Sequence, residues 1–403
     1  MIKYSTMEDD KKQNIQSLKL KLKKYLELEN VSILAGAGTS WHLGAPTIRK
    51  IPDELKKEMS KEINLYFSKG SEPSYEDLFN CLQADKFLKI NKNENTDEIQ
   101  KSIHKMQNWL FSKCNTEKTS IKDKKDLLLK ENRYYYHELF IKKLLQRPSN
   151  LKRANLFTTN YDLAFDYALD NLGIHYINGF SGVHNRCFRP EVYDYDIYYP
   201  GQSVSGKVHR AEKVLRYYKL HGSLSWIATE KTLSNPYGIK EIPIDNFNFQ
   251  EQMNLMIYPC VSKKTFTLDL PYSELFRNFA NSIIQPQSVL IALGYSFYDE
   301  HINDIIYQAL TIPSFTLIIA NYSPDKNENI EKLKRLNDSR IIIIDEANTD
   351  DKANTELSTF TGFVKNVMPD LYEEEENEAV LKTMKELYPA GKQTSGDSGN
   401  EQK

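Results

Sequence analysis

Short apolar runs of strand type, separated by stretches of helical spacing, most limit what this chain can fold into. Most of the runs are continuous, as in Ile341-Ile342-Ile343-Ile344, which is typical of parallel strands covered on both faces. Helical spacing between the runs, for example over 299–310 and 326–336, indicates that strands and helices alternate. We therefore expect an α/β fold, a Rossmann-like, doubly wound, mostly parallel sheet. The strand-type runs cover residues 31–35, 154–158, 215–220, 253–258, 288–293, 315–320 and 340–345.

Residues from about 52 to 150 interrupt this alternation. Apolar residues recur there at helical spacing, as over 99–110, the charged faces are rich in lysine, and there is almost no strand signal. We expect an inserted helical lobe within a sheet domain that spans residues 1–370. The last part, 371–403, begins with the acidic stretch 373–376 and ends in a Gly-, Ser- and Gln-containing segment. This composition predicts an acidic helix followed by a disordered tail.

A second interruption lies at residues 178–213, which are irregular in pattern and rich in tyrosine. Tyr193, Tyr195, Tyr198 and Tyr199 nearly alternate there. Two interpretations remain open for this segment: an ordered loop packed over the core, or a lid over an active site.

Charge and cysteine content limit the classes of function. The 403 residues include 53 basic and 55 acidic side chains, a net charge of −2, which argues against direct nucleic-acid binding or recruitment to an anionic membrane. No apolar leader is visible and no run approaches the ~20 residues that span a bilayer, so we expect a soluble, cytoplasmic protein. The cysteines form no close pair, which predicts neither a structural zinc site nor a disulfide framework. They are Cys81, Cys114, Cys187 and Cys260.

Three of the strand-type runs end in glycine or polar residues. The segment Gly36-Ala37-Gly38-Thr39-Ser40 follows the first, Asn160 and Asp162 follow the second, and His221-Gly222 follows the third. The carboxyl ends of strands in an open α/β sheet build its ligand crevice, and glycines there let backbone amides approach a phosphate. Taken singly, Asn160 and Asp162 could instead cap the helix that begins near Leu163, and His221 could be an ordinary buried histidine.

Together with Gly294-Tyr295-Ser296, these segments resemble the sirtuin family of NAD-consuming proteins. Residues 36–49 match the sirtuin pattern GAGxSxxxGxPxxR without a gap. Asn160 and Asp162 match the Asn and Asp of its QNxD segment, and His221-Gly222 matches its catalytic His-Gly pair. Sirtuins also carry a helical insertion on a Rossmann core, in line with the lobe expected here.

The resemblance implies a role for each of these residues, with NAD as the substrate. Asn160 would hold the ribose or a water, Asp162 would fix that geometry, and His221 would act as general base. No metal site is expected, and His301, which follows Asp299 at a helix start, is expected to be structural or supporting. The diphosphate would be bound by Gly36, Ala37, Gly38, Thr39, Ser40 and Arg49, and the adenosine side by Gly294, Tyr295 and Ser296.

Departures from the sirtuin pattern bear on the reaction. The paired cysteines of deacylating sirtuins are missing, Ile257–Lys263 stands where an acyl-lysine clamp is usual, and Thr47 and Ile48 replace an Asp and a Phe. This combination is similar to the sirtuin-like effectors of bacterial antiphage defence, which hydrolyse NAD to nicotinamide and ADP-ribose. The resemblance thus implies an NAD glycohydrolase without zinc that acts in defence by depleting NAD.

Alternative functions and the assembly state can also be considered from the resemblance. The alternative enzyme would be a protein deacylase or ADP-ribosyltransferase. A different class would be a non-catalytic NAD or ADP-ribose sensor, or a nuclease component of a motor complex. Sirtuin-like defence effectors that stand alone and have about this length resemble those paired with a HerA-type hexameric ATPase. We therefore expect a homo-oligomer that docks onto such an ATPase ring.

Overall fold

The structure is a computed structural model that describes most of the chain. Among the residues singled out above, Thr47, Ile48, Arg49 and Cys260 lie outside the described ranges, as does the acidic segment beyond Leu371. The described residues are 8–46, 51–68, 70–122, 124–201, 208–246, 254–256, 270–320, 327–344 and 357–371.

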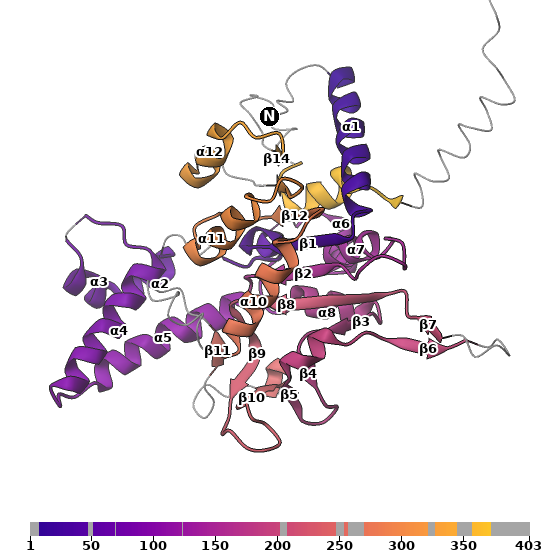
Figure 1. Ribbon diagram of the computed structural model, residues 1–403. Coiled ribbons are helices and arrows are strands. Elements are labelled where there is room, and N and C mark those ends of the chain that lie inside the picture. The colour runs from indigo at the N-terminus through magenta and orange to yellow at the C-terminus, as the bar shows by residue number, and fades with distance from the viewer. Residues whose placement is uncertain are drawn as a thin grey trace, which may run out of the picture.

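Among these residues, a seven-stranded sheet of order β14-β13-β12-β1-β2-β8-β3 forms the centre of the molecule (Figure 1). Every neighbouring pair in it is parallel, which confirms the doubly wound sheet predicted from the apolar runs. The strands are β1 (Asn30–Ala35), β2 (Asn155–Thr158), β3 (His175–Ile177), β8 (Val214–Lys219), β12 (Ser288–Leu293), β13 (Thr316–Ala320) and β14 (Ile341–Ile344).

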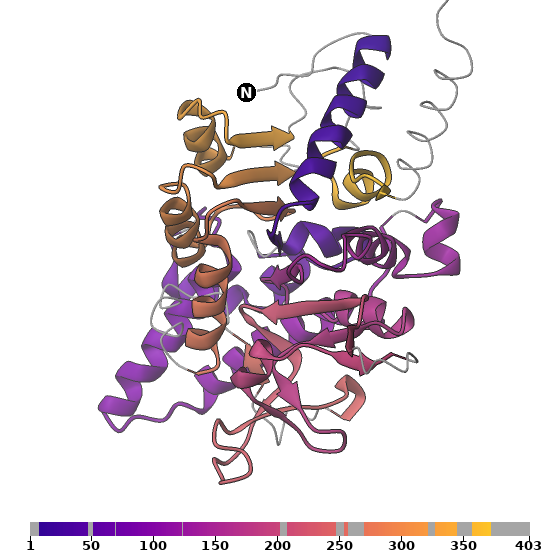
Figure 2. The ribbon, with the colours of Figure 1, turned by 45° about the vertical axis from the view of Figure 1, so that its right-hand side comes forward.

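Helices cover both faces of this sheet, and each face has its own hydrophobic cluster. Side chains alternate between the two, so that Val31 and Ile33 of β1 point into one cluster and Leu34 into the other. Figure 2 shows the stacked strands with the orange helices on one side and the indigo α1 on the other. The first face carries α1 (Glu8–Leu26), α7 (Tyr135–Leu144), α8 (Ala164–Asn171), α13 (Phe360–Gly362) and η5 (Phe363–Val367). The second carries α10 (Tyr272–Ile283), α11 (Glu300–Ala309) and α12 (Glu328–Arg335).

The helical lobe projects to one side of the sheet (Figure 1). It has a third hydrophobic cluster, which includes Tyr75 and Leu110 of the lobe together with Tyr161 and Leu224 of the sheet domain. The last part of the segment predicted as the lobe forms two helices, α6 (Leu127–Glu131) and α7. Of these, α7 packs in the hydrophobic cluster on the first face of the parallel sheet. The lobe helices are α2 (Asp53–Glu58), α3 (Ser60–Tyr66), α4 (Tyr75–Asn91) and α5 (Asp97–Cys114).

A smaller antiparallel sheet of order β11-β9-β10-β5-β4 adjoins the parallel one. It corrects two expectations: the run at 253–258 contributes a strand here, outside the parallel sheet, and 178–213 contains short strands. Irregular spacing hid those strands, because each is only two or three residues long. The elements are β4 (Phe180–Ser181), β5 (Arg186–Phe188), β9 (Gly222–Ala228), β10 (Ile239–Glu241) and β11 (Asn254–Met256), with β6 (Tyr198–Pro200) paired to β7 (Val208–Arg210), and the short helices η2 (Pro190–Asp194) and η3 (Ile244–Asn246).

The tyrosines of 178–213 divide between core and surface. Tyr193 is buried and stacks on Tyr218 at a ring-centroid distance of 4.2 Å, whereas Tyr198 and Tyr199 are exposed on β6. No helix in the described ranges is both long enough and apolar enough to cross a membrane.

Candidate active site

The predicted polar segments meet at one edge of the parallel sheet. Backbone pairing continues one residue past the strands: the Gly36 amide donates to Leu293 O (2.9 Å), Thr159 N–H to Ala35 O (3.0 Å), and Leu220 N–H to Thr158 O (2.8 Å). The strand order reverses around β1, since β2 lies on one side of it and β12 on the other. Open parallel sheets bind ligands at such a switch point, which makes this edge of the sheet a candidate ligand site.

Gly36 and Gly38 lie directly against Gly294, in the loop after β12. A Cβ atom at Gly36 would lie 2.6 Å from Gly294 O, and one at Gly38 would lie 2.7 Å from Gly294 Cα. The Gly38 amide donates to Gly294 O (2.9 Å). The amides of Gly36 and Gly38, which we expected to face a phosphate, are therefore hydrogen-bonded to the end of β12. The glycines are required here because the two loops approach backbone to backbone.

Asn160 connects the loop after β2 to the loop after β1. Its Nδ2 donates to Thr39 Oγ1 (3.0 Å) and to Ser40 Oγ (3.2 Å), and the side chain is only 7% exposed. The Asn160 backbone amide donates to Thr158 Oγ1 (3.1 Å), which fixes the turn. Within the described residues, no donor is paired with Asn160 Oδ1. This oxygen is thus the part of the side chain that can accept a hydrogen bond from a ligand or a water.

Thr39 and Ser40 belong to the 3₁₀ helix η1 (Ala37–Leu43). Both side chains are buried, and Thr39 Oγ1 also donates to Gly36 O (2.8 Å). Ala37 is the partly exposed residue at the start of this helix. The hydroxyls that the resemblance assigns to diphosphate binding are therefore engaged with Asn160 and with the loop itself.

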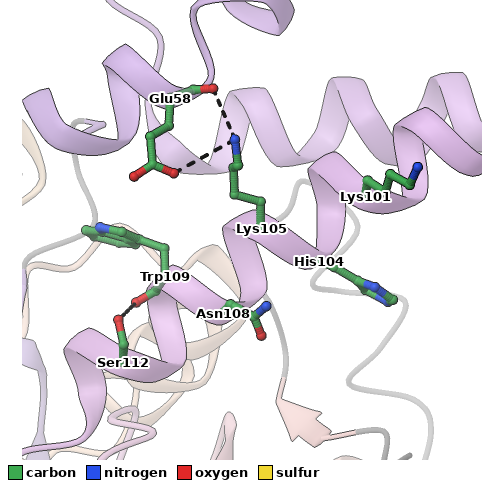
Figure 3. A pocket seen from close by; sticks show the side chains of 7 residues that line it. All are labelled: Glu58, Lys101, His104, Lys105, Asn108, Trp109 and Ser112. Atoms are coloured by element: carbon green, nitrogen blue, oxygen red, sulfur yellow. Dashed lines mark hydrogen bonds and ion pairs between the residues drawn. The ribbon is translucent and has the colours of Figure 1, made fainter. Parts of the chain in front are cut away.

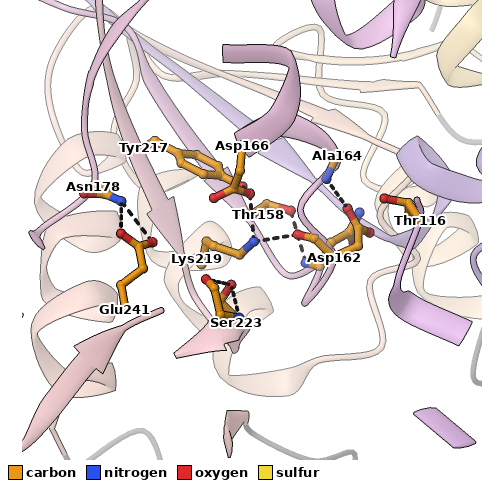
Figure 4. Close-up of polar contacts among 12 residues, drawn as sticks. Thr116, Thr158, Asp162, Ala164, Asp166, Asn178, Tyr217, Lys219, Ser223 and Glu241 are labelled. Atoms are coloured by element: carbon orange, nitrogen blue, oxygen red, sulfur yellow. Dashed lines mark hydrogen bonds and ion pairs between the residues drawn. The ribbon is translucent and has the colours of Figure 1, made fainter. Parts of the chain in front are cut away.

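Asp162 is buried and holds the start of α8. Its Oδ1 accepts the amide of Ala164, the first residue of α8 (3.0 Å), so Asp162 supports the start of this helix, although the N-cap residue is Leu163 (Figure 4). The Ser40 hydroxyl donates to the same carboxylate. Burial raises the pKa of Asp162, and the nearby Lys219 ammonium opposes that rise. Asp162 therefore acts as a positioning residue, linking α8, Ser40 and Lys219.

Lys219, two residues before His221, was missed as a site residue. It is 2% exposed, and its Nζ donates to Asp162 O (2.5 Å) and Asp166 Oδ2 (3.0 Å) (Figure 4). Asp166 Oδ2 also accepts the Tyr217 hydroxyl (2.9 Å). A lone lysine within the apolar run 214–220 was the available signal, because a buried ammonium requires an acidic partner.

His221 lies at the corner where the chain leaves the parallel sheet and enters the antiparallel one. Gly222, with φ +85°, allows this turn between β8 and β9. The His221 side chain is 4% exposed, and its Nε2 lies 3.2 Å from Nε2 of His301 in α11. Phe276 of α10 and Tyr161 lie beside the ring, at centroid distances of 6.4 and 6.5 Å. His301, expected to be structural or supporting, thus directly contacts the predicted base.

The loop after β12 is held mainly by side chains behind it. Tyr295 is buried, and its hydroxyl donates to Asp299 O (3.3 Å) and contacts Asn303 Oδ1 (3.2 Å). Burial raises the pKa of Tyr295 well above its usual range. Tyr295 therefore supports the loop from behind, whereas Ser296 is exposed and its carbonyl accepts Asn327 Nδ2 (2.7 Å). Of the three residues predicted to contact adenosine, Ser296 is the one whose side chain reaches the surface.

The cysteines in the described residues are dispersed. Cys81 lies in α4, Cys114 at the end of α5 and Cys187 in β5, and all three are free. Among the described residues, the set of potential metal ligands that converges is His221, Asp299 and His301, whose ligand atoms all lie within 4.8 Å of one another.

A hollow of about 520 Å³ opens elsewhere, on the lobe (Figure 3). Its lining comes only from α2 and α5, and none of the predicted site residues takes part. Lys105 Nζ donates to the Glu58 carbonyl (3.4 Å) and lies 3.9 Å from the Glu58 carboxylate. We therefore assign the candidate site to the sheet edge, where the polar side chains are buried and converge, and not to this hollow.

Comparison with known proteins bears on the same edge of the sheet. Residues 154–344 match the family model described as the SIR2-like domain, a span that includes Asn160, His221 and Gly294. No curated protein matches the chain in sequence.

Solved structures give a weaker similarity. A Sir2 homologue–NAD complex is 13% identical, with a TM-score of 0.41, and the match covers 86% of this chain and 93% of that one. A mutant Sir2 homologue in complex with ADP-ribose is 13% identical, with a TM-score of 0.38, covering 86% and 96%. At TM-scores below 0.5 these likenesses are too loose to assign residues, so the site rests on the chain's own geometry.

Proposed function

We propose that this chain is an NAD glycohydrolase, which converts NAD and water to nicotinamide and ADP-ribose. The observation that carries the proposal is the convergence of Asn160, His221 and the loop after β1 at one edge of the sheet, within and beside a segment that matches the SIR2-like domain. A binding module would need no buried histidine at this edge of the sheet, because recognition alone requires no general base.

The proposed reaction breaks the bond between ribose C1′ and the nicotinamide nitrogen. The electron pair of that bond goes to nicotinamide, which leaves as a neutral molecule and needs no proton. The oxygen of water bonds to C1′, and His221 accepts the proton that the water loses. Asn160 Oδ1 would orient the water or a ribose hydroxyl, since its Nδ2 is held by Thr39 and Ser40.

Substitution of the two predicted catalytic residues tests the proposal. We expect His221→Ala to lower kcat/KM by about 10²–10⁴-fold, the usual contribution of a general base. Asn160→Ala should cause a loss of similar size. His184→Ala is the matched control, because His184 is exposed in the turn between β4 and β5 of the antiparallel sheet, and its turnover should equal that of the unmodified chain.

The measurement is release of nicotinamide and ADP-ribose by chromatography, with and without an acetylated lysine peptide. Hydrolysis should proceed without the peptide. A strict requirement for it would favour the deacylase alternative, and unchanged turnover in both the Asn160 and His221 variants would contradict the site. Thermal melting of each variant separates loss of chemistry from loss of fold.

We further propose that the enzyme acts in antiphage defence, as a homo-oligomer docked on a HerA-type ATPase ring. The support is the family resemblance in the sequence. Light scattering on the chain alone and after co-expression with such an ATPase tests the assembly. A strict monomer that does not bind the ATPase would contradict this part of the proposal.

A further inference from the structure

Two histidines and an aspartate from distant parts of the chain meet beside the predicted base. His221 comes from the turn after β8, and His301 from the first turn of α11, where Asp299 is the N-cap residue. One ligand atom from each lies within 4.8 Å of the other two, and the two Nε2 atoms are 3.2 Å apart. Both histidines are buried and Asp299 is partly buried.

The conformation of Asp299 is unusual for its position. An aspartate at an N-cap normally accepts a hydrogen bond from an amide in the first helical turn. Here the Asp299 side chain makes no such bond, and the amides of Ile302 and Asn303 donate to its backbone carbonyl (3.1 and 3.0 Å). The carboxylate lies near the two imidazoles, which brings a negative charge to a pair of nitrogen ligands.

The spacing of these atoms matches a known coordination geometry. Zinc binds imidazole nitrogen at ~2.0–2.1 Å, so two such ligands on a tetrahedral ion lie about 3.3 Å apart. The observed separation of the two Nε2 atoms is 3.2 Å. We propose that His221, His301 and Asp299 bind a divalent cation of the zinc class, with a fourth position open to water or an added ligand.

The surroundings favour such a site. Phe276 packs edge-on against His301 with ring centroids 5.0 Å apart, and the Tyr161 ring lies 6.5 Å from that of His221. Apolar walls lower the local dielectric and strengthen the attraction between a cation and the Asp299 carboxylate. Two imidazoles and one carboxylate form a ligand set that zinc accepts in proteins. This is a different site from the cysteine ribbon of deacylating sirtuins, and it departs from our expectation of no metal.

The cation site goes beyond the proposed function and does not depend on it. It has a consequence for that function, because a ring nitrogen that binds a cation has no lone pair for a proton. Cation binding and proton acceptance at His221 Nε2 are therefore mutually exclusive. Zinc should inhibit NAD hydrolysis reversibly, with a loss of about 10²-fold or more at saturation, comparable to removal of the base.

Titration of the chelator-treated full chain with Co²⁺ tests the site without any NAD. Co²⁺ reports tetrahedral coordination through its visible absorption, and Zn²⁺ should then displace it. We expect one equivalent of Co²⁺ per chain. His301→Gln and Asp299→Asn preserve the size of the side chains and should weaken binding by more than the about 10–100-fold typical of outer-shell changes.

Exposed His104, on the lobe, provides the matched control, and His104→Gln should bind Co²⁺ like the unmodified chain. Absence of stoichiometric Co²⁺ and Zn²⁺ binding would overturn the inference, as would binding that is unchanged in both the His301 and Asp299 variants. Cation binding by a chain that does not hydrolyse NAD would support the site and contradict the proposed function. Hydrolysis of NAD by a chain that binds no cation would support the proposed function and contradict the cation site.

Discussion

Two buried polar clusters adjoin the candidate site, and they differ in how their polar atoms are paired. Lys219, Asp166 and Asp162 form one network, in which the Lys219 ammonium lies 3.0 Å from the Asp166 carboxylate and donates to the Asp162 carbonyl. His42, two residues after Ser40, stacks on His137 at 5.3 Å. Within the described residues, His42 Nε2 and both ring nitrogens of His137 have no hydrogen-bond partner.

The two clusters should differ in how the stability of the fold responds to mutation and to pH. The Lys219 network is charged and paired, so that removing one member leaves another buried without compensation. The histidine pair is uncharged at neutral pH, because burial lowers the pKa of His42 to about 3 and that of His137 well below its usual value. The first cluster should therefore be sensitive to mutation, and the second to acid.

The largest effect is expected for Lys219→Met. Breaking a buried ion pair by removing one partner costs about 3–5 kcal/mol of unfolding free energy. Urea denaturation measures this loss. The double variant Lys219→Met/Asp166→Asn should recover part of it, because the carboxylate that pairs with Lys219 at 3.0 Å is then no longer buried as an anion without a partner.

Lys213→Met is the control for this prediction, since Lys213 is exposed on the same segment of chain. Its stability should change by less than about 1 kcal/mol, as is usual for surface charges. A loss of that small size for Lys219→Met would show that the network does not hold the site together.

A smaller and pH-dependent effect is expected from the histidine pair. The unfolded chain binds protons on these rings below pH ~6.5, whereas folded His42 does so only near pH 3. Their contribution to stability is therefore complete above pH ~6.5 and is lost as the pH falls toward 3, by about 2 kcal/mol at pH 5 for His42. Asp126 and Arg133 act on His42 in opposite directions and leave burial as the main cause.

Replacing one ring tests this dependence. His137→Leu should flatten the fall in unfolding free energy between pH 7 and 5, because one of the two protonation steps is removed. His184→Leu, at an exposed position, should leave the slope unchanged. If His137→Leu shows the same acid sensitivity as the unmodified chain, then the pair does not control it.

The parallel sheet could be predicted because its strands are continuous apolar runs. Successive residues of β12 are buried on opposite faces of the sheet, Leu290 in one cluster and Ile291 in the other, so both must be apolar and the run is continuous. The strand β9 was missed, although Ser223-Leu224-Ser225-Trp226 alternates in polarity, which is a strand signal. Short strands such as β4 and β5 carry too few residues for any period to be visible.

The candidate site could be predicted only where its residues follow strands directly. Asn160 and His221 were found in this way, because strand ends in a parallel sheet share an edge. The contact between His221 and His301 could not be predicted, since it depends on how α11 packs against the turn after β8. The pairing of the Gly36 and Gly38 amides with β12 was hidden for the same reason: a glycine pattern does not say whether a ligand or another backbone lies close.

The most direct test of the central claim is the fate of the water oxygen. NAD turnover by the full chain in H₂¹⁸O, followed by mass spectrometry of the ADP-ribose before its anomeric oxygen exchanges with the solvent, reports whether water reached C1′; ADP-ribose added to the same water without the enzyme gives the exchange background. A glycohydrolase predicts one ¹⁸O atom in each ADP-ribose released, without added peptide, at a rate that His221→Ala lowers by about 10²–10⁴-fold. ADP-ribose found only on a protein, or as an acylated ester that forms only with an acyl-lysine peptide, would contradict the account.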